Sequence, residues 1–194
     1  ISRSGYTADQ VAYMILRNAG ITDVSIHHIP GDLTDNYNPR EHTLNLSDKV
    51  YGSRSIAAIG VAAHECGHAI QHARHYVPLT VRSAIIPAAN LGSSLAWPLV
   101  LIGLIIPRLN FCMTIGILLF SLVVILQLVT LPVEFNASRR AIQIIRDSGY
   151  LAPDELKGAK SVLKAAAMTY VAAMVSVSLQ LLRLVILRNS RDDN

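Results

Sequence analysis

The fold is decided by the stretch SAIIPAANLGSSLAWPLVLIGLIIP, residues 83–107, which contains no charged side chain. A second uncharged run, LNFCMTIGILLFSLVVILQLVTLPV, follows at residues 109–133. Each run is 25 residues long, and about 20 apolar residues are enough for a helix to cross the hydrocarbon core of a bilayer. Because Arg108 alone separates the two runs, the sequence predicts an antiparallel transmembrane hairpin.

The composition of the whole chain also favours a membrane protein. Of the 194 residues, 52% are hydrophobic and 15% are charged, whereas soluble domains carry about 25% charged residues. A third uncharged run covers residues 165–182 and is followed by Arg183, which predicts a less apolar third span. Two cysteines are too few for a disulfide scaffold, and nothing in the sequence indicates a nucleic-acid partner.

The basic residues predict how the chain is oriented in the membrane. Seven Lys and Arg residues lie in 1–82 and six in 134–164, whereas the hairpin turn carries one. By the positive-inside rule, both basic segments are expected to be cytoplasmic. The expected fold is mainly α, a multi-span helical membrane protein with a small cytoplasmic α+β portion. The expected segments are that portion at 1–82, the hairpin at 83–133, a cytoplasmic helical segment at 134–164, a transmembrane helix at 165–187 and a tail at 188–194.

Local patterns predict the elements of the first 82 residues. A capping box, Thr7 to Gln10, begins an amphipathic helix that Gly20 ends. Alternating residues predict strands at 24–29 and 43–46, and Asn-Pro within 36–41 predicts a turn between them. From position 55 to about 75 the chain is rich in Ala, Ile, Val and His without proline. This composition predicts a second helix.

The second predicted helix carries the sequence His64-Glu65-Cys66-Gly67-His68, which fits H-E-x-x-H. Residues four apart lie on one side of a helix, about 6 Å apart along its axis. Two imidazoles so placed can bind one zinc ion, and Glu65 can act as general base on a zinc-bound water. The competing interpretation is a chance pair of histidines on an Ala-rich helix. Gly67 disfavours it, because a small residue there lets another backbone approach.

A third zinc ligand is predicted where the second span ends, at Glu134. The alternative is an interfacial carboxylate that only caps the span. A metzincin would place its third histidine where Arg74 stands, so that class of zinc protein is excluded. His72 lies about 12 Å along the axis from His64, so His72 and His75 are interpreted as surrounding or interfacial residues.

Taken together, these motifs resemble the YugP-like family of membrane zinc metallopeptidases. The resemblance implies His64 and His68 as zinc ligands, Glu65 as catalytic base and Glu134 as third ligand of one Zn²⁺ per chain, a gluzincin-like set. It also implies a transmembrane helix just upstream of Ile1. The stretches that carry it are residues 4–7, 33–39, 60–69, 131–140 and 165–171.

The chain is more distantly similar to the HtpX-type and CAAX prenyl proteases, and it departs from their pattern at one position. Those proteins pair H-E-x-x-H with E-x-x-A-D, but here Ser138 stands in the last place. The group that holds a ligand histidine by its other ring nitrogen must then lie elsewhere, or a hydroxyl replaces it. Tyr37, His28 and Asn136 are candidates to stabilise the oxyanion. An edge strand within 36–47 could bind an extended peptide.

These observations predict a membrane-embedded zinc endopeptidase. By analogy its substrate is a membrane-associated or misfolded polypeptide, and its other partner is the lipid bilayer of the cell membrane. Two alternatives are a non-catalytic scaffold with a structural zinc site, which would need four protein ligands, and a transporter or channel. The oligomeric state does not follow from the sequence.

Overall fold

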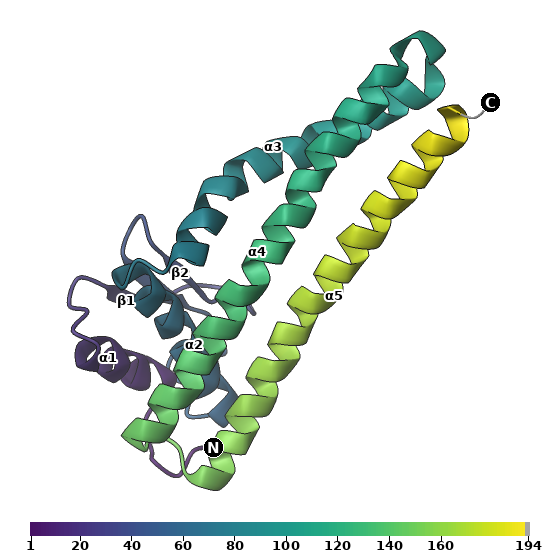
Figure 1. The fold of residues 1–194 in the computed structure, drawn as a ribbon. Coiled ribbons are helices and arrows are strands. Elements are labelled where there is room, and N and C mark those ends of the chain that lie inside the picture. The colour runs from purple at the N-terminus through teal and green to yellow at the C-terminus, as the bar shows by residue number, and fades with distance from the viewer. Residues whose placement is uncertain (193–194) are drawn as a thin grey trace. The chain divides into compact units, whose positions relative to one another are not determined.

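The computed structural model describes residues 1–192 and divides into two compact units. Unit 1 comprises Ile1–Tyr76 and Val133–Ala167, and unit 2 comprises Val77–Pro132 and the chain from Met168 onward. Two helices, α4 and α5, contribute residues to both units (Figure 1).

Unit 1 begins with helix α1, Ala8–Asn18. The predicted capping box is present, since the Thr7 amide donates to Gln10 Oε1 at 3.0 Å. Gly20 ends the helix with φ +76°, a conformation that costs glycine little. The apolar side of α1, which includes Val11 and Ile15, is buried in the core of the unit.

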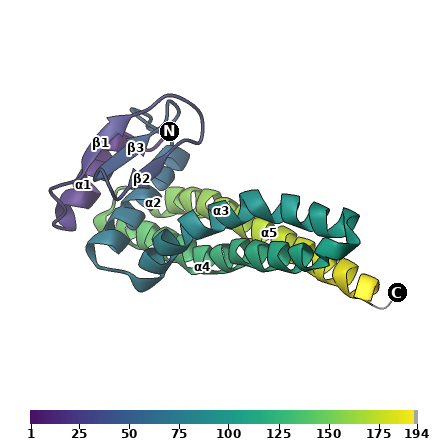
Figure 2. The same cartoon turned by 90° about the horizontal axis from the view of Figure 1, so that it is seen from above.

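A three-stranded sheet follows α1, in the order β1-β3-β2 (Figure 2). β1 is Ser25–His28, β2 is Asn36–Asn38 and β3 is Thr43–Leu46. β1 pairs with β3 in parallel and β2 pairs with β3 antiparallel. The buried Leu44 and Leu46 of β3 join the core.

The sheet confirms two predicted strands and corrects two other expectations. The turn predicted at 36–41 begins with strand β2, whose polar residues have low strand propensity and are held by pairing with β3. Since β3 is paired on both sides, only β2 is an edge within the segment 36–47. The surface for an added peptide strand there is shorter than expected.

The helix predicted from position 55 is α2, Ile56–Ala73. Its N-cap is Ser55, whose Oγ accepts from the Ala58 amide at 3.0 Å. One side of α2 packs on α1, where Cys66 Sγ lies 3.6 Å from Ala12 O. Unit 1 is completed by the end of α4 and the beginning of α5.

Unit 2 contains helix α3, Val77–Ile105, and the first part of α4, Asn110–Ser148, joined by a short 3-10 helix, Pro107–Leu109. Glycines let α3 and α4 pack closely. A Cβ added at Gly103 would lie 2.5 Å from Met113 N, and one at Gly116 would lie 2.8 Å from Ala96 O. Small residues at helix contacts are typical of membrane proteins.

Helix α5 is Pro153–Asp192. It continues through residues 188–192 of the predicted tail, and residues 193–194 of that tail lie outside the described residues. Within residues 1–192, three helices are long and apolar enough to cross a membrane: Val77–Ile105, Pro107–Ser148 and Pro153–Ser190. Prolines 87, 98 and 132 lie inside these helices.

Candidate metal centre

The H-E-x-x-H residues lie in α2, and a glycine brings this helix against α4. A Cβ added at Gly67 would lie 2.7 Å from Ala137 O, closer than real Cβ contacts allow. Glycine at this position therefore permits a backbone approach that alanine would prevent. The contact places the His64 and His68 side of α2 beside the Glu134 turn of α4, within unit 1.

Three side chains converge at this contact, as the sequence predicted. Glu134 Oε2 lies 3.1 Å from His64 Nε2 and 3.5 Å from His68 Nε2. The donor atoms of all three residues lie within 4.8 Å of one another. Tetrahedral zinc, with bonds of about 2.0–2.1 Å, places neighbouring donors about 3.4 Å apart. Two nitrogens and one carboxylate oxygen at these separations therefore fit a zinc ion.

The His64 ring is held by the residue that departs from the HtpX-type pattern. His64 Nδ1 lies 3.0 Å from Ser138 Oγ. When His64 Nδ1 donates this hydrogen bond, Nε2 is left unprotonated toward Glu134 and the metal position. The neutral hydroxyl of Ser138 therefore stands where the HtpX-type pattern has an aspartate.

The His68 ring is held by Gln71, which is fully buried. Gln71 Oε1 lies 2.9 Å from His68 Nδ1, and Gln71 Nε2 donates to Val133 O at 2.8 Å and to Asn136 Oδ1 at 3.0 Å. One carboxamide thus orients a candidate ligand histidine of α2 and also bonds to α4. No pattern in the sequence marks Gln71, although its position three residues after His68 places it on the same side of α2.

When metal is absent, the charges around this centre favour the protonated form of His68. Burial alone lowers the pKa of His68, but the hydrogen bond and charge of Glu134, together with the charge of Glu65, raise it on balance. Zinc binds a neutral imidazole, so metal and proton compete for His68. Affinity for zinc is therefore expected to fall as the pH is lowered.

Glu65, the predicted general base, follows His64 in α2 and is largely buried, with 9% of its surface exposed. It is not one of the three side chains whose donor atoms converge. Its charge nevertheless acts on His68, whose pKa it helps to raise.

The remaining residues named from the sequence do not belong to the three converging side chains. Tyr37 Oη lies within hydrogen-bond distance of His72 Nδ1, at 2.8 Å, and burial raises the pKa of Tyr37 to about 12. His28 instead bonds Asp48 at 2.8 Å. Of the three oxyanion candidates, Asn136 is the one that contacts a partner of a ligand histidine, through Gln71.

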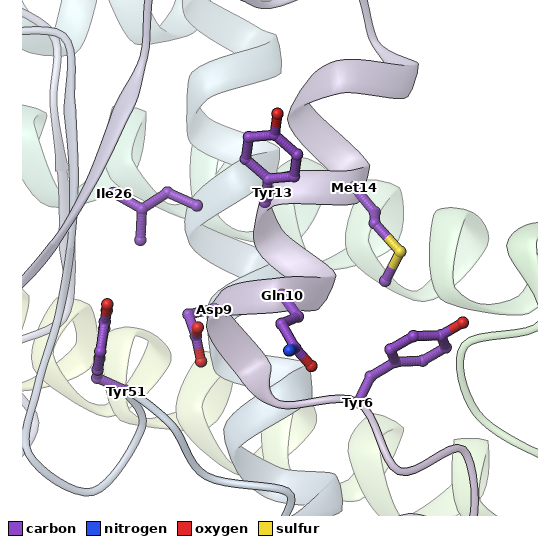
Figure 3. A pocket seen from close by; sticks show the side chains of 7 residues that line it. All are labelled: Tyr6, Asp9, Gln10, Tyr13, Met14, Ile26 and Tyr51. Atoms are coloured by element: carbon purple, nitrogen blue, oxygen red, sulfur yellow. The ribbon is translucent and has the colours of Figure 1, made fainter.

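A separate pocket of unit 1, about 430 Å³ in volume, lies around the first turns of α1 (Figure 3). Three tyrosines line much of it, Tyr6, Tyr13 and Tyr51, with Ile26 of β1 beside them. None of the metal-binding candidates lines this pocket.

Replacing Gln71 by leucine is expected to weaken zinc binding about 10–100-fold, the usual effect of losing the partner of a ligand histidine. Leucine keeps the volume but leaves His68 Nδ1 and Val133 O without their bonds. Competition with a fluorescent zinc chelator measures the affinity. Gln143, exposed on α4 of the same unit, provides the control; Gln143→Leu is expected to change the affinity by less than about twofold. Equal affinities in both variants would contradict the role given to Gln71.

Cys66 is expected to resist alkylation in the native protein. The side chain is fully buried, burial raises the pKa of its thiol, and only the thiolate reacts readily. N-ethylmaleimide should modify Cys66 after denaturation and not before, as read by mass spectrometry of the peptide that contains it. Rapid modification of the native chain would show that α1 and α2 separate in solution.

Comparison with known proteins agrees with this centre. A family model described as "Putative neutral zinc metallopeptidase" matches residues 1–189. Over 192 residues the chain is 47% identical to "Putative membrane protease YugP" of Bacillus subtilis (strain 168), an alignment covering 98% of this chain and 85% of that protein. No solved structure matches the chain significantly. The chain therefore belongs to the zinc metallopeptidase family that this model describes.

Proposed function

We propose that this protein is a membrane-embedded zinc endopeptidase. One observation carries the proposal: two histidine nitrogens and a glutamate oxygen from α2 and α4 converge to within 4.8 Å of one another, and Glu65 is buried next to His64 in the sequence. In this proposal His64, His68 and Glu134 bind one Zn²⁺ per chain, and a water completes the coordination.

Bound zinc would lower the pKa of this water toward about 7 and polarise the carbonyl of the scissile peptide. Glu65 would take a proton from the attacking water and give it to the amide nitrogen as the C–N bond of the peptide breaks. Ser138 and Gln71 keep the two imidazoles in the tautomer that binds metal through Nε2. The carboxamide of Asn136 is the candidate donor to the oxyanion.

We also propose the membrane arrangement. Three helices meet the requirements for crossing a bilayer, and the relative in Bacillus subtilis is described as a membrane protease. The excess of Lys and Arg in 1–82 and 134–164 supports a multi-pass protein in the cell membrane with the metal centre on the cytoplasmic side. The proposed substrate is a polypeptide, and a membrane-associated one suits this location.

The number of ligands favours catalysis over a structural zinc site. Within residues 1–192, the group that could hold a metal contains three side chains. Structural zinc is closed by four protein ligands, whereas catalytic zinc keeps one position for water.

Metal content tests the proposal directly. We expect about one zinc per chain in the detergent-purified protein, and loss or strong weakening of binding in His68→Ala and Glu134→Ala, measured by mass spectrometry of the metal. His75→Ala is the matched control, because His75 lies beyond the end of α2, and it should retain the ion. A folded wild-type protein without tightly bound metal would contradict the proposal.

A further inference from the structure

Unit 2 contains an open cavity of about 450 Å³ whose lining comes from α3, α4 and α5. All three helices are long and apolar enough to cross a membrane. The cavity nevertheless has six hydrogen-bonding side chains in its lining: Arg82, Asn90, Gln127, Thr130, Thr169 and Tyr170. None of them is a predicted metal ligand.

Polar side chains in such helices need an explanation, because hydrocarbon offers them no hydrogen bonds. Asn90 lies inside the uncharged run 83–107, and Gln127 and Thr130 lie inside the run 109–133. Thr130 is buried, and its hydroxyl donates to Leu126 O at 2.7 Å. Its oxygen retains lone pairs that can accept a further bond. Polar residues at this depth typically mark a path or a site for a polar ligand.

The lining also indicates which ligand fits. The carboxamides of Asn90 and Gln127 each donate and accept hydrogen bonds. A peptide backbone alternates N–H donors with C=O acceptors and matches such a surface. A phosphate group accepts only, and it is best held by several cations, whereas the lining contains one, Arg82.

The size of the cavity agrees with a peptide. Arg82 and Asn90 are eight residues apart in α3, which corresponds to about 12 Å along a helix. An extended chain covers this distance with about three to four residues. The cavity therefore has room for a short unwound stretch.

We propose that this cavity binds the unwound backbone of a membrane-inserted polypeptide segment. The proposal rests on the proposed function, since such a segment would be a peptidase substrate. A transmembrane helix satisfies its own backbone groups, so an intact helix gains little from the cavity. A transmembrane segment whose helix is broken by glycine and proline exposes free backbone N–H and C=O groups. The cavity can bind these groups.

Two probe peptides test this distinction. One is a fluorescent Leu/Ala transmembrane helix, and the other is the same peptide with a central Gly-Pro pair. The full-length Glu65→Gln protein is reconstituted in phosphatidylcholine nanodiscs, so that neither probe is cleaved, and binding is measured by energy transfer. We expect the broken peptide to bind at least about tenfold more tightly, a ratio equivalent to one good hydrogen bond to the cavity.

Replacing both amides, Asn90→Leu with Gln127→Leu, is expected to abolish this preference. The matched control is Gln180→Leu, which changes an exposed glutamine of α5 outside the cavity lining, and it should keep the preference. Equal binding of both peptides to the unaltered cavity would overturn the proposal. So would a co-purified phospholipid that the double variant loses while its peptide preference persists.

A second measurement applies if the double variant does not fold. A photo-reactive benzoylphenylalanine at Ile86, in the cavity lining, should crosslink to the broken peptide. The same group at Leu179, which is 61% exposed on α5, should crosslink mainly to lipid. Equal peptide crosslinking from both positions would overturn the proposal. Neither assay requires hydrolysis. If the zinc measurement contradicts the proposed peptidase function, the binding and crosslinking results therefore still test the cavity independently.

Discussion

Glu65→Gln is expected to lower the rate of peptide hydrolysis about 10²–10⁴-fold while the protein keeps its zinc. This range is the usual contribution of a positioned general base, and the glutamine amide cannot accept the proton of the attacking water. Hydrolysis is followed with fluorescently quenched peptides and with fluorescent casein, in detergent and in liposomes. Zinc content is measured on the same preparations, since Glu65 is not one of the three converging ligands.

The control for this prediction is Glu41→Gln, which makes the same chemical change at an exposed site. It should retain wild-type activity. Full activity of Glu65→Gln would show that the base is wrongly assigned. Loss of zinc together with activity would instead place Glu65 in the metal coordination.

Gly67→Ala is expected to disrupt the metal centre without touching a ligand. In an isolated helix, alanine is more favourable than glycine by about 0.5–1 kcal/mol. Here the added Cβ would lie 2.7 Å from Ala137 O, so α2 and α4 must move apart within unit 1. Overpacking of this kind costs about 1–3 kcal/mol, and the donor atoms that now lie 3.1 and 3.5 Å apart would separate.

We therefore expect Gly67→Ala to bind zinc at least about tenfold more weakly, because a displacement of 1 Å already misplaces a ligand. Gly60→Ala is the matched control on the same helix. Its Cβ would meet Ala159 Cβ at 3.4 Å, a tight but tolerable contact. Chelator competition on both variants decides the question, and wild-type affinity in Gly67→Ala would contradict the close contact between α2 and α4.

Much of the fold followed from local patterns. Runs without charge predicted the long apolar helices, and the capping residue Thr7 with the terminal Gly20 predicted α1, which begins at Ala8. Strand β2 escaped prediction because its three residues, Asn36–Asn38, have no strand pattern of their own. It exists because β3 offers it hydrogen-bonding partners, and such pairing between separate segments is not written in either segment.

The metal centre was also predictable only in part. His64 and His68 share one side of α2 by their spacing alone, because helical geometry relates residues four apart. Glu134 could be named from its place after an apolar run, yet its approach to His64 spans 70 positions of the chain. The sequence left open whether the Ser138 hydroxyl or a more distant group holds a ligand histidine, and the contact with His64 decides for Ser138. Gln71 was not named from the sequence, although it lies on the same side of α2 as His68.

The sequence by itself determined three things: an apolar chain with helices long enough to span a membrane, a histidine pair at metal-binding spacing, and a carboxylate at the end of an apolar run. These properties depend on composition and on residues a few positions apart. Only the tertiary structure decided which backbone approaches Gly67, namely that of α4 at Ala137, and that Ser138 and Val133 of α4 bond to His64 and Gln71 of α2. The physical reason is that hydrogen bonds and close packing act over about 3–4 Å, whatever the separation along the chain.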